Sequence, residues 1–482
     1  MSDHIIFFKR VLLTGIVRIV AVIKSLFLLS IITKNLGASN YGIFVQVITT
    51  VLFLQPFVEL GLGSSIVRFL SSKNKEEIIQ GIITILSIVL LAGIITSLGL
   101  YLLSGNFANL FLKEESAEFI VKLASPLVML DPLIAISLNS FRIFGQVKKY
   151  FEVSILQSLL EISFIICSVS LGFGLVGIFV STLFTRLIIL IIILHLLISY
   201  AGFKIPNFRL IKPYLIYSFP FIFTAVFEIV IALSDRYVIG FYMGSKDVGI
   251  YAASYSIGSI ISVYSALIMY VLYPTLSNYY DKGLVREINV YLSYTWKYLM
   301  MLLIPSFFGL SILSSQLVSI FATSEFVFEG KYIVVIISLS MIFNSLYSLY
   351  GGIILLTKNT HIFALSCIFS GLLNLLLNIL FVPIYGIIAA AVSTLISYLI
   401  SAMIIYIYSR SIKFHIDYRF LVKSIFSSII MTYFIWLYNP QGNLETLISV
   451  IIGCIVYFSI LLLSKGFDEI EMETIYKIVN LE

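Results

Sequence analysis

Several ionisable residues lie inside long apolar stretches of this sequence, and nine of them are the residues best placed to bind ions or substrate. They are Arg18, Lys24, Glu59, Asp131, Glu161, Arg186, Glu228, Asp235 and Arg236. An ionisable side chain near the middle of a bilayer costs roughly 2.5–3.5 kcal/mol, so such residues pair with one another or serve a function. Guanidinium and ammonium groups bind phosphate oxygens well. We therefore expect anion binding and transport, and we assign no catalytic residue.

Position along each helix predicts which charges meet, because a helix rises about 1.5 Å per residue. Arg18 lies about two turns into the first apolar stretch, and Glu59 and Asp131 reach a similar depth in the second and the fourth. These three side chains could form one cluster. Glu161 and Arg186 match in depth on two consecutive antiparallel stretches, so we expect a salt bridge between them.

Lys24 lies deeper in the first stretch, and no carboxylate of its own half of the chain is clearly level with it. Glu228 has a comparable depth in the other half. Two interpretations stay open. Lys24 either snorkels or pairs with Glu228 to hold the halves together, or it joins Arg18 and Arg186 in a cationic wall suited to a diphosphate.

The remaining assignments concern coupling and gating. Asp235 and Arg236 lie near the outer end of their stretch, which favours an interfacial pair or an outer gate over substrate contact. A carboxylate such as Glu161 or Glu228 could couple transport to H⁺ or Na⁺. The residues assigned to coupling or gating are Glu59, Asp131, Glu161, Glu228, Asp235 and Arg236. No spacing of histidines or cysteines predicts a metal site and no phosphate-binding loop motif occurs, so no cofactor is expected.

These charges stand out because the rest of the chain is apolar. Sixty per cent of the residues are hydrophobic and 11% are charged, and the mean hydropathy is +1.09. So much apolar surface excludes a soluble protein, and a membrane-spanning helix needs about 20 apolar residues. Such stretches fall at roughly 11–33, 43–66, 78–103, 117–141, 151–172, 175–200, 214–241, 249–276, 294–320, 332–356, 361–382, 386–409, 420–437 and 446–464. We predict an all-α polytopic membrane protein with about 14 transmembrane helices.

Two pairs of matching segments indicate an internal repeat. Residues 36–44 and 243–251 each hold two glycines five positions apart and an aromatic residue two positions after the second glycine. Gly174 and Gly386 are each followed, six positions later, by Val-Ser-Thr-Leu. Self-similarity on this scale is typical of transporters built from two like halves.

The repeat divides the chain into two pseudo-symmetric six-helix lobes around a central cleft. The predicted boundaries are 1–203 for the first lobe, 204–213 for a cytoplasmic linker, 214–410 for the second lobe, and 411–482 for two extra helices and an acidic tail. Lysine and arginine gather in the loops on the N-terminal side of the membrane, which predicts that both termini are cytoplasmic. The net charge of +6 then reflects topology in the cell membrane and requires no nucleic-acid partner.

Several of these segments resemble a known family. The resemblance rests on residues 235–244 (DRYVIGFYMG), 248–251 (VGIY), 35–37 (NLG) and 41–42 (YG). They are similar to the signature of polysaccharide-repeat flippases, the O-antigen-translocase-like members of the multidrug/oligosaccharidyl-lipid/polysaccharide exporter superfamily. The resemblance implies that a cleft between two six-helix bundles carries the headgroup of a lipid-linked oligosaccharide across the membrane. It would place Arg18 and Lys24 among the cationic residues of that cleft.

The resemblance also implies a function and partners. The substrate would be an oligosaccharide on polyprenyl pyrophosphate, moved by alternating access from the inner to the outer leaflet for cell-surface polysaccharide biosynthesis. An inside-negative potential pushes an anionic headgroup outward with about 2.3 kcal/mol per charge per 100 mV, and an H⁺ or Na⁺ gradient is an alternative drive. Membrane lipids surround the protein, and a polysaccharide polymerase and glycosyltransferases are expected to act beside it.

Three other functions remain open. A lipid II flippase differs from the expected function only in its substrate. A MATE-type multidrug exporter would want an acidic, aromatic cleft, which the basic residues of the first helix disfavour. A membrane glycosyltransferase or polymerase would need catalytic residues on a sizeable loop, and the longest outer loops, near 104–116 and 321–331, offer little beyond Glu114, Glu115, Glu325 and Glu329. We therefore expect a transporter and not an enzyme.

Overall fold

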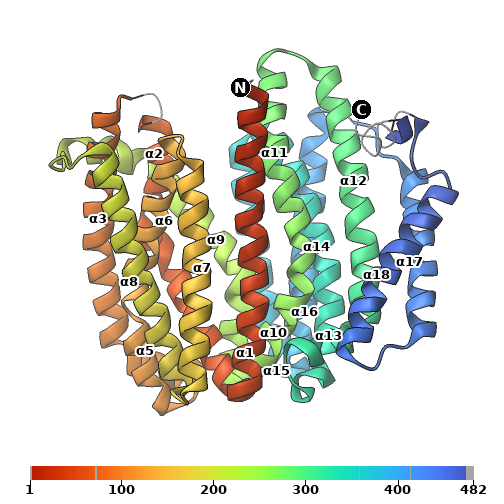
Figure 1. Ribbon diagram of the computed structural model, residues 1–482, viewed down its shortest axis with the longest axis horizontal. Helices are drawn as coiled ribbons and strands as arrows, with labels where there is room; N and C mark the ends of the chain where they lie inside the picture. Colours follow the sequence, from red (N-terminus) through yellow and green to blue (C-terminus); the bar gives the residue numbers. More distant parts are fainter. Residues whose placement is uncertain (1–2, 71–72, 358, 413, 470, 474–482) are drawn as a thin grey trace. The chain divides into compact units, whose positions relative to one another are not determined.

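The computed structural model describes residues 3–70, 73–357, 359–412, 414–469 and 471–473. Within these ranges all regular secondary structure is helical (Figure 1). Twelve helices are long and apolar enough to cross a membrane, and a bent pair, Ile211–Phe219 with Phe221–Met243, adds a thirteenth. The predicted all-α polytopic class is confirmed.

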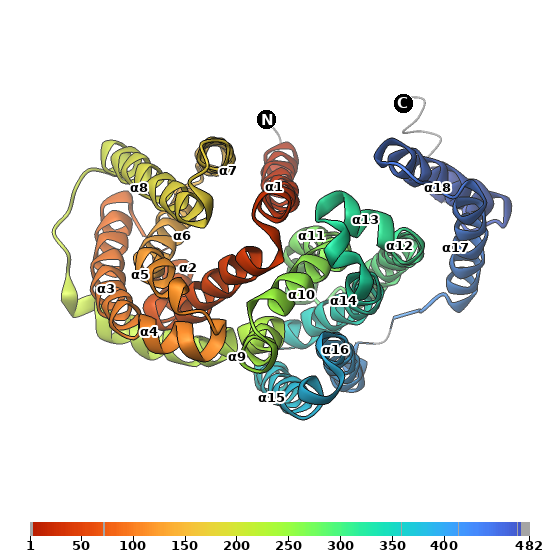
Figure 2. The same ribbon diagram turned by 90° about the horizontal axis from the view of Figure 1, so that it is seen from below.

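The first helix accounts for the difference from fourteen spans. Helix α1, Asp3–Glu59, contains both of the first two predicted stretches, and its apolar part, Leu13–Glu59, counts as one span of 47 residues. A straight helix of that length would measure about 70 Å, more than twice the thickness of the hydrocarbon core. At Gly37 the backbone leaves helical values, with φ 76° and ψ −177°, and α1 changes direction (Figure 2). Helix α1 therefore holds two spans, and counting both brings the number of spans to the predicted fourteen.

The helices gather into two compact units. The first comprises Met1–Ala253 and Cys367–Ser397, and the second comprises Ser254–Ser366 and Tyr398–Glu482. This grouping follows packing and not the internal repeat. The lobe boundaries near residues 203, 214 and 410 stay predictions.

The first unit is a helical bundle built around α6, α7 and α8, which lie side by side (Figures 1 and 2). Its helices are α1, α2 (Leu62–Leu70), α3 (Lys75–Leu102), α4 (Ser104–Phe107), α5 (Glu118–Ala124), α6 (Leu127–Ile143), α7 (Val147–Ser170), α8 (Gly174–Ala201), α9 (Ile211–Met243) and parts of α10 (Ser245–Gly258), α15 (Thr360–Tyr385) and α16 (Ile387–Tyr408). One core cluster joins Leu138 and Phe141 of α6 to Ile189 and Ile193 of α8. Their spacing of three or four residues puts each pair on one helix face.

The second unit carries the C-terminal hairpin. Its further helices are α11 (Ser262–Asp281), α12 (Val285–Ile312), α13 (Ser314–Phe321), α14 (Val327–Leu356), α17 (Tyr418–Tyr438) and α18 (Asn443–Leu463). Helices α17 and α18 lie side by side in both views (Figures 1 and 2). Leu313, Phe420, Met431 and Tyr457 are buried together where this hairpin meets the helices before it. The two extra helices thus pack as one element of the second unit.

The two repeated glycine segments cross each other in the first unit. A Cβ atom at Gly42 would overlap the carbonyl oxygen of Ser245, and one at Gly249 would overlap the carbonyl oxygen of Ala38. Ala38 and Ser245 hold the same position in the two segments, and so do Gly42 and Gly249. The two contacts are therefore related by the repeat, and only glycine lets the backbones approach this closely.

We expect Gly42→Ala and Gly249→Ala each to lower the free energy of unfolding by roughly 1–3 kcal/mol, because the added methyl group would force the backbones apart. The measurement is the midpoint of thermal unfolding in detergent. Gly63→Ala is the matched control, since a Cβ there meets nothing within 4 Å. A crossing variant as stable as this control would contradict the close approach.

A buried ion pair ties the acidic C-terminal tail to α12. Lys297 Nζ lies 2.5 Å from Glu471 Oε2, and the two side chains are only 8% and 5% exposed. The Asp468 N–H donates to Glu471 Oε2 and the Glu471 N–H donates to Asp468 Oδ1, both at 2.8 Å. Lys297 also lies 5.2 Å from the ring centroid of Phe420 on α17. Asp468 and Glu471 thereby fix the described part of the tail to α12.

Lys297→Met is expected to cost about 3 kcal/mol of stability, because it leaves the Glu471 carboxylate buried without its cation. The double variant Lys297→Met/Glu471→Leu should recover most of that loss, since replacing a whole buried pair by apolar residues is often neutral. Denaturant titration of both variants checks this. A double variant no more stable than the single one would show that the pair is not an independent contact.

Candidate functional site

Four of the predicted charged residues meet in the first unit, one from each of α1, α6, α7 and α8. Arg186 donates from Nε to Asp131 Oδ1 at 2.6 Å and from Nη1 to Glu161 Oε2 at 3.1 Å. Its Nη2 donates to Glu161 Oε1 at 3.4 Å. Lys24 donates from Nζ to the same Glu161 Oε2 at 2.8 Å. We call Lys24, Asp131, Glu161 and Arg186 the charge cluster.

The charge cluster has a buried centre and two more accessible members. The Glu161 and Arg186 side chains are 7% and 13% exposed, whereas those of Lys24 and Asp131 are 20% and 24% exposed. Two cations and two carboxylates leave the group neutral overall. Neutrality and the two-point contact between Arg186 and Glu161 offset the cost of burying these charges.

The cluster confirms one expected contact and corrects another. The salt bridge between Glu161 and Arg186 is present. The expectation that Lys24 has no carboxylate of its own half at its level is wrong, since it pairs with Glu161. Both helices begin before the predicted boundaries, α1 at Asp3 and α7 at Val147, so counting residues from those boundaries does not give the depth of a side chain. A long lysine side chain also reaches well beyond its own Cα.

Arg18, Glu59 and Glu228 lie outside the charge cluster, so the suggested grouping of Arg18, Glu59 and Asp131 does not form. Asp131 pairs with Arg186 instead. Arg18 on α1 and Glu228 on α9 are exposed, and Glu59 is half-buried at the end of α1. Glu59 lines a small cavity of about 190 Å³. Within the described ranges none of these three side chains forms an ion pair, and their roles stay predictions.

Asp235 is fully buried in the first unit. Its carboxylate accepts hydrogen bonds from the Tyr251 hydroxyl and, at 2.8 Å, from the backbone N–H of Arg236. The Arg236 guanidinium donates to Thr49 Oγ1 at 3.1 Å. Both predicted residues therefore face the interior of the protein, where they join α9 to α10 and to the second half of α1.

A neutral polar group beside them escaped the sequence analysis. Asn374 Oδ1 accepts from Ser234 Oγ at 3.0 Å and from Asn378 Nδ2 at 2.9 Å, and Asn374 Nδ2 donates to Thr394 Oγ1 at 3.5 Å. Asn378 Oδ1 is buried and finds no donor among the residues that the structure describes. A search for charges misses such residues. Two asparagines four positions apart in an apolar stretch were the available signal, because that spacing puts them on one helix face.

One family model matches more than half of this chain. The model described as "Polysaccharide biosynthesis protein" matches residues 7–280, which include the whole charge cluster. This chain belongs to the polysaccharide biosynthesis protein family. A second model, MatE, matches residues 220–380.

One relative of this polysaccharide biosynthesis family member shares about a quarter of its residues over the matched region. A protein of Haloferax volcanii named "Probable low-salt glycan biosynthesis flippase Agl15" is 23% identical over 286 residues, which are 58% of this chain. The match covers about 60% of that relative's length. The two chains therefore share part of their sequence, and the relative's activity does not pass to this chain by similarity alone.

Several solved structures share the fold of this family member. The lipid II flippase MurJ in an inward closed conformation gives a TM-score of 0.74 at 20% identity, over 98% of this chain and 100% of that one. An inward-facing multidrug resistance MATE transporter of the MOP superfamily gives 0.70 at 16% identity, over 82% and 97%. A MOP superfamily transporter from Pyrococcus furiosus, described as having a binding pocket of reverse polarity, gives 0.64 at 15% identity, over 84% and 95%. At these identities the likeness shows the fold, which is the predicted two-lobe fold.

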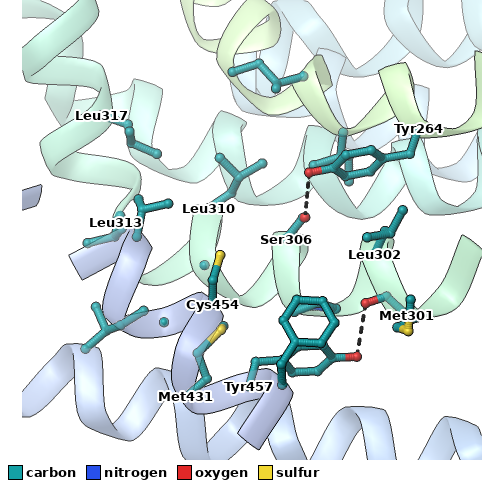
Figure 3. Close-up of a pocket in the computed structure, with 18 residues that line it drawn as sticks. Tyr264, Met301, Leu302, Ser306, Leu310, Leu313, Leu317, Met431, Cys454 and Tyr457 are labelled. Carbon is teal, nitrogen blue, oxygen red and sulfur yellow. Dashed lines mark hydrogen bonds between the residues drawn. The ribbon is translucent and has the colours of Figure 1, made fainter. Parts of the chain in front are cut away.

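An apolar pocket in the second unit is a further candidate site of this polysaccharide biosynthesis protein. It has a volume of about 270 Å³ and lies among α11, α12, α13, α17 and α18 (Figure 3). Two hydrogen bonds join residues that line the pocket. Tyr457 donates to the Met301 carbonyl oxygen at 3.0 Å, and Ser306 donates to the Tyr264 hydroxyl at 3.4 Å. No charged side chain lines it, so it suits an apolar chain.

A second apolar pocket, of about 620 Å³, lies in the first unit and is lined by Phe53, Phe107, Phe111 and Tyr237. The Tyr237 ring packs edge-on against Phe53 and Phe111, with centroids 6.0 and 5.4 Å apart. No group of three or more histidine, cysteine, aspartate or glutamate side chains arranged to hold a metal ion occurs in the part of the chain that the structure describes.

Proposed function

We propose that this protein is a flippase that moves an oligosaccharide carried on polyprenyl diphosphate from the inner to the outer leaflet by alternating access. The observation that carries the proposal is the family match over residues 7–280, which takes in α1 with Arg18 and Lys24. The name of the Haloferax relative, a glycan biosynthesis flippase, and the fold shared with a lipid II flippase support it.

The basic residues of α1 are the proposed diphosphate ligands. Arg18 is exposed and Lys24 is partly exposed, so both can reach a headgroup. Hydrogen bonds between such cations and phosphate oxygens are roughly twice as strong as neutral ones.

The proposed driving force is the membrane potential or a gradient of H⁺ or Na⁺. Asp235 supports coupling to a cation because its carboxylate is fully buried. Asn378 Oδ1, which has no hydrogen-bond partner among the described residues, is a further oxygen that could bind a cation or a hydrogen-bond donor. We also propose that the protein lies in the cell membrane with both termini in the cytoplasm. It would act beside a polysaccharide polymerase and glycosyltransferases.

The test is transport in vesicles of defined lipid. The purified protein is reconstituted with a radiolabelled polyprenyl-diphosphate oligosaccharide, and the headgroup that becomes accessible to a membrane-impermeant hydrolase is measured over time. Protein-containing vesicles should expose the glycan much faster than empty ones. Lipid II is the second substrate, since the fold match with its flippase covers 98% of this chain. Vesicles that move an organic cation and neither glycolipid would refute the proposal and support a multidrug exporter.

A further inference from the structure

One carboxylate oxygen in the charge cluster serves two cations. Glu161 Oε2 accepts from Lys24 at 2.8 Å and from Arg186 at 3.1 Å. The other oxygen, Oε1, accepts from Arg186 alone, at 3.4 Å. If Lys24 moves away, Glu161 therefore keeps its two hydrogen bonds from the buried Arg186 guanidinium. The contact between Lys24 and Glu161 can break without leaving a bare carboxylate in the interior, which would be the costly outcome.

The two cations differ in how free they are to leave. All three nitrogens of the Arg186 guanidinium are engaged, one by Asp131 and two by Glu161. The Lys24 ammonium has three N–H donors, and among the described residues Glu161 is its one acceptor. Lys24 is also the more exposed cation, at 20% against 13%. Lys24 is the exchangeable member of the charge cluster and Arg186 the fixed one.

We propose that Glu161 is the resting counter-ion of Lys24, and that the diphosphate of the substrate must displace it to bind. This inference rests on the proposed function for the identity of the anion. Glu161 then acts as a positioning residue, since it never touches the substrate and sets how often Lys24 is available. The apparent affinity for the substrate is proportional to the fraction of time that Lys24 is free, so pairing with Glu161 lowers it.

The net charge of the cluster gives Glu161 a second effect, on release of the bound diphosphate. With Lys24 drawn to the diphosphate, the remaining cluster of Arg186, Glu161 and Asp131 carries one net negative charge. That charge repels the bound anion and attracts Lys24 back. Glu161 thus weakens binding and speeds release, which is the combination that a transporter needs on the far side of its cycle.

The binding test uses farnesyl diphosphate, a short isoprenoid diphosphate, with the full-length protein in detergent and isothermal titration. Glu161→Gln keeps the size of the side chain and removes its charge, so we expect the Kd to fall about tenfold, equivalent to about 1.4 kcal/mol. Asp131→Asn is the matched control, because it removes the same charge from Arg186 without touching Lys24, and its Kd should change much less. In the double variant Glu161→Gln/Lys24→Ala the gain should vanish.

A transport measurement separates this role from a structural one. In the vesicle assay Glu161→Gln should lower both KM and the maximal rate, whereas a merely misfolded variant would lose rate without gaining affinity. Glu161→Asp, which retracts the carboxylate from Lys24 and keeps its charge, provides a second variant with the same expected direction and a smaller effect. Farnesyl diphosphate binding that is unchanged or weaker in folded Glu161→Gln and Glu161→Asp would overturn the proposal.

The outcomes also separate this inference from the proposed function. If the protein moves no lipid-linked glycan while Glu161→Gln still tightens farnesyl diphosphate binding, the transport proposal fails and the counter-ion role stands. If the glycan moves and Glu161→Gln brings no gain in affinity, the counter-ion role alone fails.

Discussion

Vesicles that carry Lys24→Ala are expected to translocate a lipid-linked glycan about 100-fold more slowly than vesicles with the unaltered protein. The variant removes a charge-assisted hydrogen bond to the diphosphate, and such bonds contribute about 1.5–3 kcal/mol. It also leaves Glu161 with Arg186 as its partner, so the fold should persist. Arg18→Ala is expected to slow transport in the same way, and the double variant should not exceed the rate of empty vesicles.

Two controls accompany this measurement. Lys24→Arg keeps the charge and should restore much of the rate, although a guanidinium differs in shape and hydration from an ammonium. Lys204→Ala removes an exposed lysine whose side chain is 43% accessible and pairs with Glu76 at 2.8 Å. It should leave transport unchanged. Normal rates in both Lys24→Ala and Arg18→Ala would refute the diphosphate site on α1.

Arg186→Ala is expected to destabilise the protein by about 5 kcal/mol, the upper end of the range for breaking a buried ion pair. The variant strips both Asp131 and Glu161 of their shared cation and leaves Glu161 with Lys24 alone. Whole proteins are stable by only about 5–15 kcal/mol, so little folded protein should remain. The measurement is the yield of monodisperse protein after extraction, together with its thermal midpoint.

Arg186→Lys should cost less than Arg186→Ala, because one cation remains, though it cannot contact both carboxylates in the same fork geometry. Arg142→Ala is the control for removing an arginine from the same bundle, since that side chain is exposed at the end of α6. Its stability should fall by no more than about 1 kcal/mol, the size of an exposed cation–π contact such as the one that Arg142 makes 5.7 Å from the Tyr150 ring centroid. A stable Arg186→Ala variant would mean that the charge cluster contributes little to the first unit.

Much of the fold could be predicted because apolar length is a local property. The stretch at 294–320, for example, corresponds to α12 and α13, which begin and end within a few turns of it. The apolar stretches at 11–33 and 43–66 leave a gap at residues 34–42, whereas in the structure Gly37 alone interrupts the helix. One residue with a positive φ angle is enough to redirect a chain. A break of one residue barely changes the hydrophobic periodicity of the sequence, so that periodicity does not locate it.

The candidate site was harder to predict because its contacts join distant parts of the chain. Glu161 and Arg186 were paired correctly because they lie on consecutive helices. Lys24 meets Glu161 across 137 positions, and Lys297 meets Glu471 across 174. Such contacts depend on how helices are arranged around one another, which residue counting does not fix. Asn378 could not be found from the pattern of charged residues, because its side chain is neutral.

The glycine crossing bears on the origin of the chain. Because each copy presents both the glycine and the carbonyl oxygen that the other copy needs, the contact surface is self-complementary. A half-length ancestor with a single copy would therefore meet a second molecule of itself through the same contacts, as in a two-fold symmetric dimer. Gene duplication and fusion would then keep that interface inside one polypeptide, and the loss of either glycine would disturb a contact with the other half.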